Sequence, residues 1–240
     1  METTKALVLN CVRYNDNGVV VSFFTERYGS ISSLVRIPNT RRRNALLSLL
    51  QRLSLVEIEI DYRETRDMQS IRNVSLYYPW TSIPYNPVKA SVAMFIAEFL
   101  YNALRSEGVN VGLFSFLEQS LVWFDQNMEG IANFHLLLPI KLTMFLGIMP
   151  NIEGYREGMF FDMQCGECVE VPPLHRYMLD RDETSFLPVL LGTDYCQMHG
   201  LAITREQRGH ILEIIIMYYR LHVPGFRSLQ SMGVLREVFA

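Results

Sequence analysis

The sequence predicts an α+β protein in which a small five-stranded β-barrel is followed by an α-helical domain. Before residue 80, apolar and polar residues alternate in several short segments, which is the period of a half-buried strand. After residue 86, apolar residues recur every three or four positions, as on an amphipathic helix. Pro79, Pro84 and Pro87 mark the change of period. We therefore expect a barrel domain at 1–80 and a helical domain at 81–240.

The barrel is expected from strand-like segments that are joined by turn residues. Asn15-Asp16-Asn17-Gly18 ends the first segment and Tyr28-Gly29 separates the second from the third, because asparagine and glycine accept the backbone angles of tight turns. A polar, basic break at 38–44 follows, and the segment LSLVEIEIDY then alternates most regularly. Short strands with such turns are typical of a small barrel. The expected strands are residues 5–14, 19–25, 30–37, 53–62 and 71–77.

The helical domain is expected to begin at Asn86-Pro87, where a capping side chain precedes a proline at the first helical position. Thr204 and Gln207 have the spacing of a capping box at the start of the longest helix. Repeated glycines and prolines break the stretch 151–203, which we expect to be an irregular insertion. The expected helices are residues 87–108, 111–128, 131–146, 204–221 and 228–239.

The net charge of −3 conceals an asymmetry between the two parts of the chain. Residues 1–82 carry 11 Lys and Arg against 8 Asp and Glu, a balance of +3. The remainder carries 11 against 17, a balance of −6. A basic part joined to an acidic part suggests a polyanion as the partner of the first and a different partner for the second.

The amino terminus lacks the basic and apolar segments of a secretory signal, so we expect a soluble cytoplasmic protein. The most apolar stretch, 134–149, is interrupted by His135, Pro139 and Lys141, and it is too short for a membrane span. It is therefore expected to form a buried core helix. In a reducing compartment the four cysteines are thiols or metal ligands.

A basic cluster between residues 36 and 43 is the main candidate binding site. Guanidinium groups bind phosphate in a bidentate manner and stay charged at physiological pH. Tyr28, Phe23 and Phe24 lie close by in the sequence, and unstacked bases can lie on such rings. The alternative is a solvated basic loop beside core phenylalanines. The candidate DNA-binding residues are Arg27, Tyr28, Arg36, Arg41, Arg42 and Arg43.

Four further residues have the types and part of the spacing of a zinc site. Cys165 and Cys168 form a CxxC pair, and Cys196 and His199 repeat the same spacing. Two such pairs can surround a tetrahedral zinc ion. The gap of 27 residues between the pairs is long for a compact zinc ribbon, and a cysteine can also act as a small buried apolar residue. We therefore expect no bound metal, and a zinc site is the less favoured alternative.

The sequence contains no nucleophile–base signature, phosphate-binding loop or HExxH motif, so we expect a protein that is not an enzyme. The acidic residues Asp180, Asp182 and Glu183 are interpreted as a helix cap.

Arg205 and Arg208 lie three residues apart at the start of the longest expected helix, and they therefore share a face. The simpler interpretation is a solvated edge beside the core. The more specific hypothesis is a groove that accepts an acidic peptide with an apolar end.

Several short motifs lie in order along the chain. They are Ala6-Leu7-Val8-Leu9, Tyr14-Asn15-Asp16, Phe24-Thr25-Glu26-Arg27-Tyr28-Gly29, the basic loop, residues 53–59, Tyr218-Tyr219-Arg220-Leu221-His222, and Leu229-Gln230-Ser231 with Leu235. In this order and spacing the chain resembles the RecO family of bacterial recombination mediators along its whole length. Phe161-Asp162 and Pro173-Leu174-His175 look like the Bacteroidetes branch of that family.

The resemblance implies an amino-terminal OB-fold and a helical domain that, in many members, carries a four-cysteine zinc module. It also implies binding of single- and double-stranded DNA, annealing of strands coated by single-stranded-DNA-binding protein, and loading of RecA together with RecR. The carboxy-terminal tail of the coating protein would bind the helical domain. Two positions depart from the family pattern: Arg36-Ile37 replaces a lysine–glycine pair, and Cys196 with His199 replaces the second CxxC.

Two alternatives to the mediator remain. One is a protein-interaction module of a repair or replication complex that does not contact DNA. The other is a zinc-dependent DNA-binding regulator.

Overall fold

The computed structural model describes residues 2–238 apart from residues 39 and 41. The chain divides into two compact units. The first unit contains Met1–Gln126 with Leu229–Ser231, and the second contains Asn127–Ser228 with Met232–Ala240. The unit that holds the barrel thus continues past residue 80, and the domain limits expected at 80 and 81 stay a prediction.

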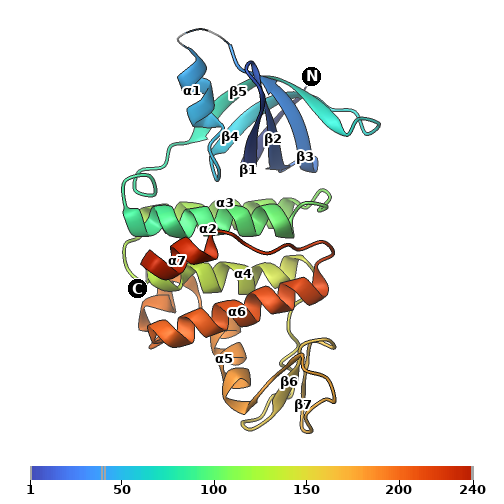
Figure 1. Ribbon diagram of the computed structural model, residues 1–240, viewed down its shortest axis with the longest axis vertical. Helices are drawn as coiled ribbons and strands as arrows, with labels where there is room; N and C mark the ends of the chain where they lie inside the picture. The colour runs from blue at the N-terminus through green and yellow to red at the C-terminus, as the bar shows by residue number, and fades with distance from the viewer. Residues whose placement is uncertain (1, 39, 41, 239–240) are drawn as a thin grey trace. The chain divides into compact units, whose positions relative to one another are not determined.

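Five strands of the first unit close into a barrel in the order β1-β2-β3-β5-β4 (Figure 1). Neighbouring strands are antiparallel except β3 and β5, which pair in parallel through Ser32–Met68 and Ser33–Gln69. This closed barrel, followed by helices, confirms the predicted OB-fold and α+β class. The strands are β1 (Glu2–Asn15), β2 (Gly18–Thr25), β3 (Gly29–Arg36), β4 (Leu55–Asp61) and β5 (Met68–Tyr78).

The inward positions of the barrel alternate as the sequence predicts, with Val21, Phe23 and Ile58 fully buried in its core. A short helix, α1 (Arg42–Leu49), joins β3 to β4 and packs leucines against this core. The sequence analysis missed α1. Its eight residues begin inside the expected basic break at 38–44 and are too few for a clear helical period.

Two helices of the first unit, α2 (Pro87–Ala103) and α3 (Val111–Gln126), pack beside the barrel (Figure 1). The Asn86 side chain accepts hydrogen bonds from the backbone N–H groups of Val88 and Lys89, which confirms the predicted cap. The Phe24 ring of β2 stacks on Phe114 of α3, with centroids 6.3 Å apart. One end of the outer barrel surface is therefore covered by helix.

The second unit is built on α4 (Phe134–Phe145) and α6 (Arg205–His222), with η1 (Ile131–Asn133) before α4 and α7 (Met232–Val238) near the end of the chain. The Thr204 side chain and Gln207 form the predicted capping box of α6. Tyr219 is fully buried and its hydroxyl donates to the carbonyl of Pro139 at 2.7 Å, which fastens α6 to α4. No helix among the described residues is long and apolar enough to span a membrane.

The stretch 151–203 contains more regular structure than the sequence indicates. It holds a three-stranded sheet in the order β7-β6-β8 and one longer helix. Asp180 and Glu183 form a capping box at the start of this helix, as predicted for the acidic cluster. Strands of two or three residues show no period, and Pro188 inside the helix suggested a break. The elements are β6 (Phe160–Asp162), β7 (Glu167–Val169), β8 (Met178–Leu179), α5 (Arg181–Gly192) and η2 (Tyr195–Gly200).

Candidate nucleic-acid interface

The outer surface of β1, β2 and β3 is exposed at the end of the strands that carries the β1–β2 turn. Val12 pairs with Val20, and Val20 pairs with Leu34, so these side chains form one row across the three strands. Arg36 lies two positions after Leu34 and shares this side, since side chains alternate along a strand. Tyr14 lies at the same end of the ladder, in a bulge of β1 between Arg13 and Asn15, and its side chain is exposed. We call the surface formed by these five residues the β1–β3 face.

A groove of about 720 Å³ opens at the end of the β1–β3 face. Gly18 lies in its wall opposite Arg36, with which it pairs across the β2–β3 ladder. A Cβ atom at Gly18 would lie 3.1 Å from the Asn15 side-chain oxygen and 3.3 Å from a Leu34 methyl group. The small residue therefore keeps this end of the face open. The groove is lined by Asn15, Asn17, Gly18, Leu34, Arg36, Ile37 and Pro38.

Arg36 lines this groove, and two further arginines, Arg13 and Arg43, contact Asp16 in the neighbouring β1–β2 turn. Arg13 pairs with the Asp16 carboxylate at 2.7 Å, and Arg43 donates to the Asp16 carbonyl at 3.4 Å. Arg36 is exposed and makes no ion pair with any residue that the structure describes. Arg36 therefore presents an uncompensated guanidinium to the solvent, which suits contact with phosphate.

The structure brings together only part of the predicted arginine cluster. Arg36 lines the groove, Arg43 contacts the β1–β2 turn at Asp16, and Arg42 is the first residue of α1. Arg41 lies outside the described residues. The sequence analysis missed Arg13, whose signal was its place just before the first turn of the barrel.

The stacking role predicted for Phe23 and Phe24 is wrong. Both side chains are fully buried, Phe23 in the barrel core and Phe24 against α3, so neither ring is exposed for a base to stack on. Tyr14 is the exposed aromatic of the β1–β3 face, with 68% of its surface accessible. The sequence analysis placed Tyr14 at the end of the first expected strand, next to a turn, where exposure is common, but did not include it among the candidate binding residues.

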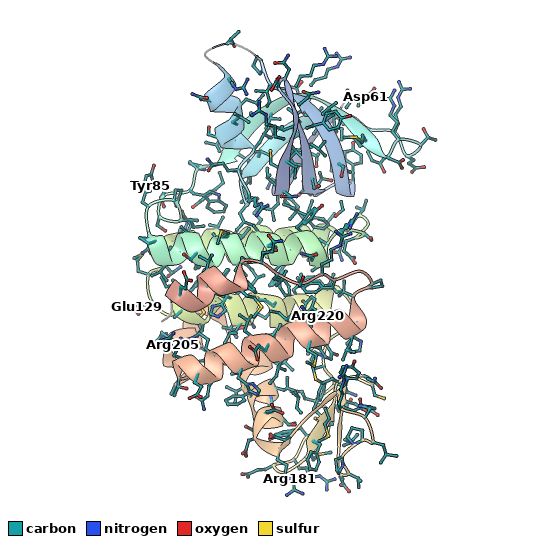
Figure 2. All side chains as sticks on the ribbon, viewed as in Figure 1. Asp61, Tyr85, Glu129, Arg181, Arg205 and Arg220 are labelled. Atoms are coloured by element: carbon teal, nitrogen blue, oxygen red, sulfur yellow. The ribbon has the colours of Figure 1, made fainter. Side chains whose placement is uncertain are left out.

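Arg27 and Tyr28 lie at the opposite end of the β2–β3 ladder from Arg36, at the turn that joins the two strands. The Tyr28 hydroxyl donates to the Glu2 carboxylate at 2.7 Å, and Arg27 pairs with the same carboxylate at 3.1 Å. Burial and the contact with Glu2 raise the pKa of the Tyr28 hydroxyl. These two residues are thus separate from the arginines around the groove (Figure 2 shows the side chains of the barrel).

The four zinc candidates lie in two separate segments of the chain. Cys165 precedes β7 and Cys168 lies within it, whereas Cys196 and His199 lie in η2, where His199 Nδ1 is 2.9 Å from the Cys196 carbonyl oxygen. Within the described part of the chain, no group of three or more His, Cys, Asp and Glu side chains could hold a metal ion. The residues do not fit a shared zinc ion.

The surroundings of both cysteines in the CxxC pair raise the pKa of their thiols. The negative charge of Asp162 raises the pKa of the Cys165 thiol, and burial raises the pKa of Cys168. Asp162 also accepts hydrogen bonds from the backbone N–H groups of Gln164 and Cys165, which holds the turn between β6 and β7.

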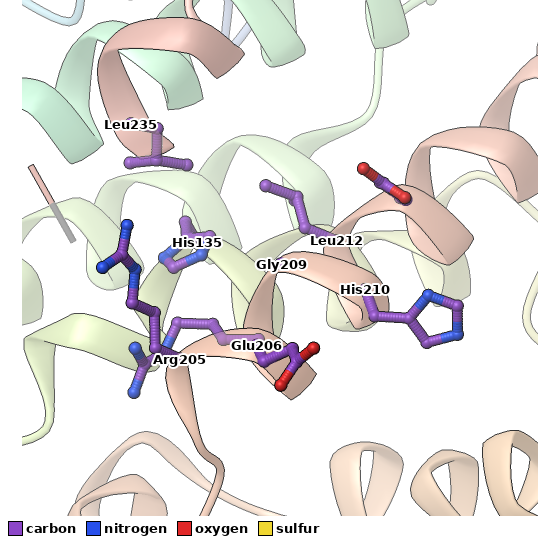
Figure 3. A pocket seen from close by; sticks show the side chains of 9 residues that line it. His135, Arg205, Glu206, Gly209, His210, Leu212 and Leu235 are labelled. Carbon is purple, nitrogen blue, oxygen red and sulfur yellow. The ribbon is translucent and has the colours of Figure 1, made fainter. Parts of the chain in front are cut away.

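Arg205 and Arg208 line one groove of about 560 Å³ in the second unit, beside the first turns of α6. We call it the α6 groove. Figure 3 shows the His135 ring between Leu235 and Arg205, whereas the His210 ring points away from them. The groove thus combines apolar side chains with two arginines, but Glu206 and Glu213 also line it. Its lining residues are His135, Arg205, Glu206, Arg208, Gly209, His210, Leu212, Glu213 and Leu235.

The two arginines of the α6 groove have different supports. Arg208 is half-buried, and it donates from Nε to the Asn133 side chain at 3.0 Å and from a terminal nitrogen to the Ile203 carbonyl at 3.3 Å. Burial lowers the pKa of the Arg208 guanidinium. Arg205 is exposed, and no ion pair joins it to another described residue. Arg208 is therefore fixed in place, whereas Arg205 can adapt to a ligand.

His135 forms the floor of this groove. Burial, and then the nearby charge of Arg208, lowers the pKa of the imidazole from its usual 6.5 to about 3. The ring is therefore neutral at physiological pH and presents an uncharged surface to whatever occupies the groove.

Comparison with known proteins agrees with this architecture. A family model described as Recombination protein O N terminal matches residues 1–80, and one described as Recombination protein O C terminal matches residues 84–230. A protein of Phocaeicola vulgatus named DNA repair protein RecO is 41% identical over 240 residues, which cover 100% of both chains. Proteins of the same name from Bacteroides fragilis and Flavobacterium psychrophilum are 39% and 32% identical, and the matches cover 100% and 99% of this chain and 99% and 98% of theirs.

The barrel, the helices and these matches define a protein of DNA repair and recombination. The chain belongs to the RecO family, and the resemblance stated from the sequence is confirmed.

Proposed function

We propose that the chain is a non-catalytic recombination mediator that binds single- and double-stranded DNA through the β1–β3 face. In this role it anneals strands coated by single-stranded-DNA-binding protein and helps RecR to load RecA, in the cytoplasm and close to the nucleoid. The observation that carries the proposal is that exposed Tyr14 and Arg36 lie at the same end of the β1–β2–β3 ladder, where Arg36 lines an open groove and Arg13 and Arg43 contact Asp16 of the β1–β2 turn.

The physical argument is that annealing requires binding and charge screening but no bond chemistry. Two strands repel each other through their phosphates, and arginines that neutralise phosphates reduce this repulsion. An exposed aromatic ring such as Tyr14 holds a base by stacking, which tolerates any sequence. A surface that joins both features can hold a strand while leaving other bases free to pair.

The α6 groove supports the partner half of the proposal. An acidic peptide with an apolar end needs a pocket that offers cations and apolar contacts, and Arg205 and Leu235 supply one of each. We propose that the carboxy-terminal tail of the coating protein binds here, with Arg205 and Arg208 contacting its carboxylates.

The alternative function is a protein-interaction module that does not contact DNA. A salt titration of oligonucleotide binding separates the two, because each phosphate contact contributes close to one unit to the dependence of log K on log salt. Reversing two charges, Arg36→Glu with Arg43→Glu, should weaken binding to oligonucleotides of every sequence and reduce the slope by about two units.

The matched control is Arg72→Glu on β5, which changes an exposed arginine outside both grooves. It should alter the slope by less than the paired variant does. Equal affinity and slope for the wild type and a folded Arg36→Glu/Arg43→Glu variant would remove the DNA-binding role and favour the interaction module.

A further inference from the structure

A second, more polar pocket of about 330 Å³ lies in the first unit, where β2 and β3 meet the β4–β5 loop and the end of α2. Its size is within the range of small-molecule sites. None of the residues in its walls belongs to the β1–β3 face. The side chains that matter for its chemistry are Ser22, Ser32, Tyr62, Arg66, Tyr101 and Arg105.

The loop that forms one wall of this pocket is held in shape by Gln69. The buried Gln69 side chain donates to the carbonyls of Arg63 and Arg66 at 2.9 and 2.7 Å, and it accepts from the Arg63 N–H at 2.9 Å. The Ser33 hydroxyl of β3 donates to the Gln69 carbonyl at 2.8 Å. A wall that is already ordered loses little conformational entropy when a ligand binds.

Tyr62 gives this wall an aromatic surface. Its ring stacks on Tyr28, with centroids 4.3 Å apart and planes inclined by 18°. Tyr28 thus supports the ring from one side, while Tyr62 remains 36% exposed and lines the pocket. A supported, partly exposed ring is the form of aromatic side chain on which an unstacked base can lie.

The charges of the pocket are balanced. Arg66 and Arg105 line it together with Glu64 and Asp67, so the lining carries no excess of either sign. Such a lining gives a phosphate little attraction, but it offers both donors and acceptors to the edge of a neutral base. Arg105 makes no ion pair within the described part of the chain, and its donors are available.

The pocket and the β1–β3 face lie along one side of β3. Ser30, Ser32, Leu34 and Arg36 occupy alternate positions of this strand, and the residues between them are buried in the barrel. The six steps from Ser30 to Arg36 span about 20 Å at the rise of a β-strand. A single strand that lies along β3 can therefore contact Arg36 at one end and reach the pocket at the other.

We propose that this pocket takes one unstacked nucleobase of a single strand bound along β3. The Tyr62 ring stacks on the base, and Arg105 with the serine hydroxyls contacts its edge. The inference rests on the proposed DNA-binding function and adds to it a fixed position for one nucleotide. A base held in this way sets the register of the strand relative to the arginines at the other end.

The test uses the whole protein and the shortest oligothymidylate that it binds, with a single abasic nucleotide placed at each position in turn. In the wild type, the abasic nucleotide should weaken binding by about fivefold or more at one position, since a stacked base is lost there. In Tyr62→Ala with Arg105→Ala, the unmodified oligonucleotide should bind more weakly, and the penalty at that position should disappear. Tyr62→Phe keeps the ring and should keep the penalty.

Tyr85→Ala is the matched control, because Tyr85 is 81% exposed and lies outside the pocket. It should leave the abasic profile unchanged. A wild-type profile without a sensitive position, or an unchanged penalty in the folded Tyr62→Ala/Arg105→Ala variant, overturns the pocket. If Arg36→Glu with Arg43→Glu still weakens binding and reduces the salt slope in that case, the proposed function stands. If the Arg36→Glu/Arg43→Glu variant binds DNA as the wild type does, the proposed DNA-binding function is contradicted as well.

Discussion

Lys89 of α2 and Asp125 of α3 form a buried polar contact in which the Lys89 ammonium donates to the main-chain carbonyl of Asp125 at 2.8 Å. The Asp125 carboxylate accepts hydrogen bonds from the backbone N–H groups of Thr81, Ser82 and Ile83, at 2.8, 2.8 and 2.9 Å. The segment after the barrel is thereby fastened to α3. Burial would raise the pKa of Asp125, but these hydrogen bonds outweigh it and lower that pKa.

Asp125→Ala should therefore destabilise the protein by about 3–5 kcal/mol, because it leaves Lys89 without its nearest negative charge and removes the acceptor of three backbone N–H groups. Urea unfolding of the wild type and the variant measures the difference. Exposed Glu153 is the matched control, and Glu153→Ala should stay within about 0.5 kcal/mol of the wild type. A similar loss for both variants would show that the contact has no special weight.

The α6 groove should bind an acidic peptide that ends in apolar residues. Arg205→Glu with Arg208→Glu should weaken the tail peptide of a single-stranded-DNA-binding protein several-fold to tens-fold, at about 1 kcal/mol for each rim charge, and should spare naked DNA. Calorimetry with the peptide measures the change. Arg220→Glu near the other end of α6 is the control for charge alone (Figure 2).

The single variant Arg205→Glu is the more informative of the two arginine changes. Arg205 is exposed, whereas Arg208 bonds to Asn133 and Ile203 and its loss also affects folding. Peptide affinity within twofold of the wild type in the double variant would place the tail elsewhere and leave both arginines as a solvated edge.

His135 should make stability depend on pH. Its pKa is about 3 in the folded protein and near 6.5 when exposed, so the unfolded chain binds a proton first as the pH falls. The contribution is fully present above pH 6.5 and is lost as the pH falls from there towards 3. Between pH 7 and 5.5 the loss should be about 1 kcal/mol.

Urea unfolding at several pH values, with His135→Gln as the comparison, checks this expectation. The variant removes the titrating group but keeps a polar side chain, so its stability should change less over the same interval. Parallel curves for the wild type and the variant would show that His135 is not the group responsible.

The purified protein should contain well below one equivalent of zinc. Cys196→Ser should cost about 1 kcal/mol, as an ordinary substitution does. Metal analysis together with thermal unfolding tests this. A stoichiometric zinc signal that Cys165→Ser abolishes would contradict it, because binding of a structural zinc ion is coupled to folding.

The sequence by itself determined the order and type of most elements. Period-two alternation located the strands, and the caps at Asn86 and Thr204 located the starts of α2 and α6. These signals are local, because a strand side or a helix cap depends on residues that are near each other in the chain. The short elements α1, β6, β7 and β8 were not predicted, since two to eight residues carry too little periodic signal.

Only the tertiary structure decided which polar and aromatic residues share a surface. Phe23 and Phe24 are adjacent to the candidate residues in the sequence, yet closure of the barrel and packing of α3 bury both. Tyr14 and Arg36 are 22 positions apart, and they lie at the same end of the barrel because β1 and β3 both pair with β2. Strand pairing and burial arise from contacts between distant parts of the chain, so a pattern of neighbours along the sequence cannot specify them.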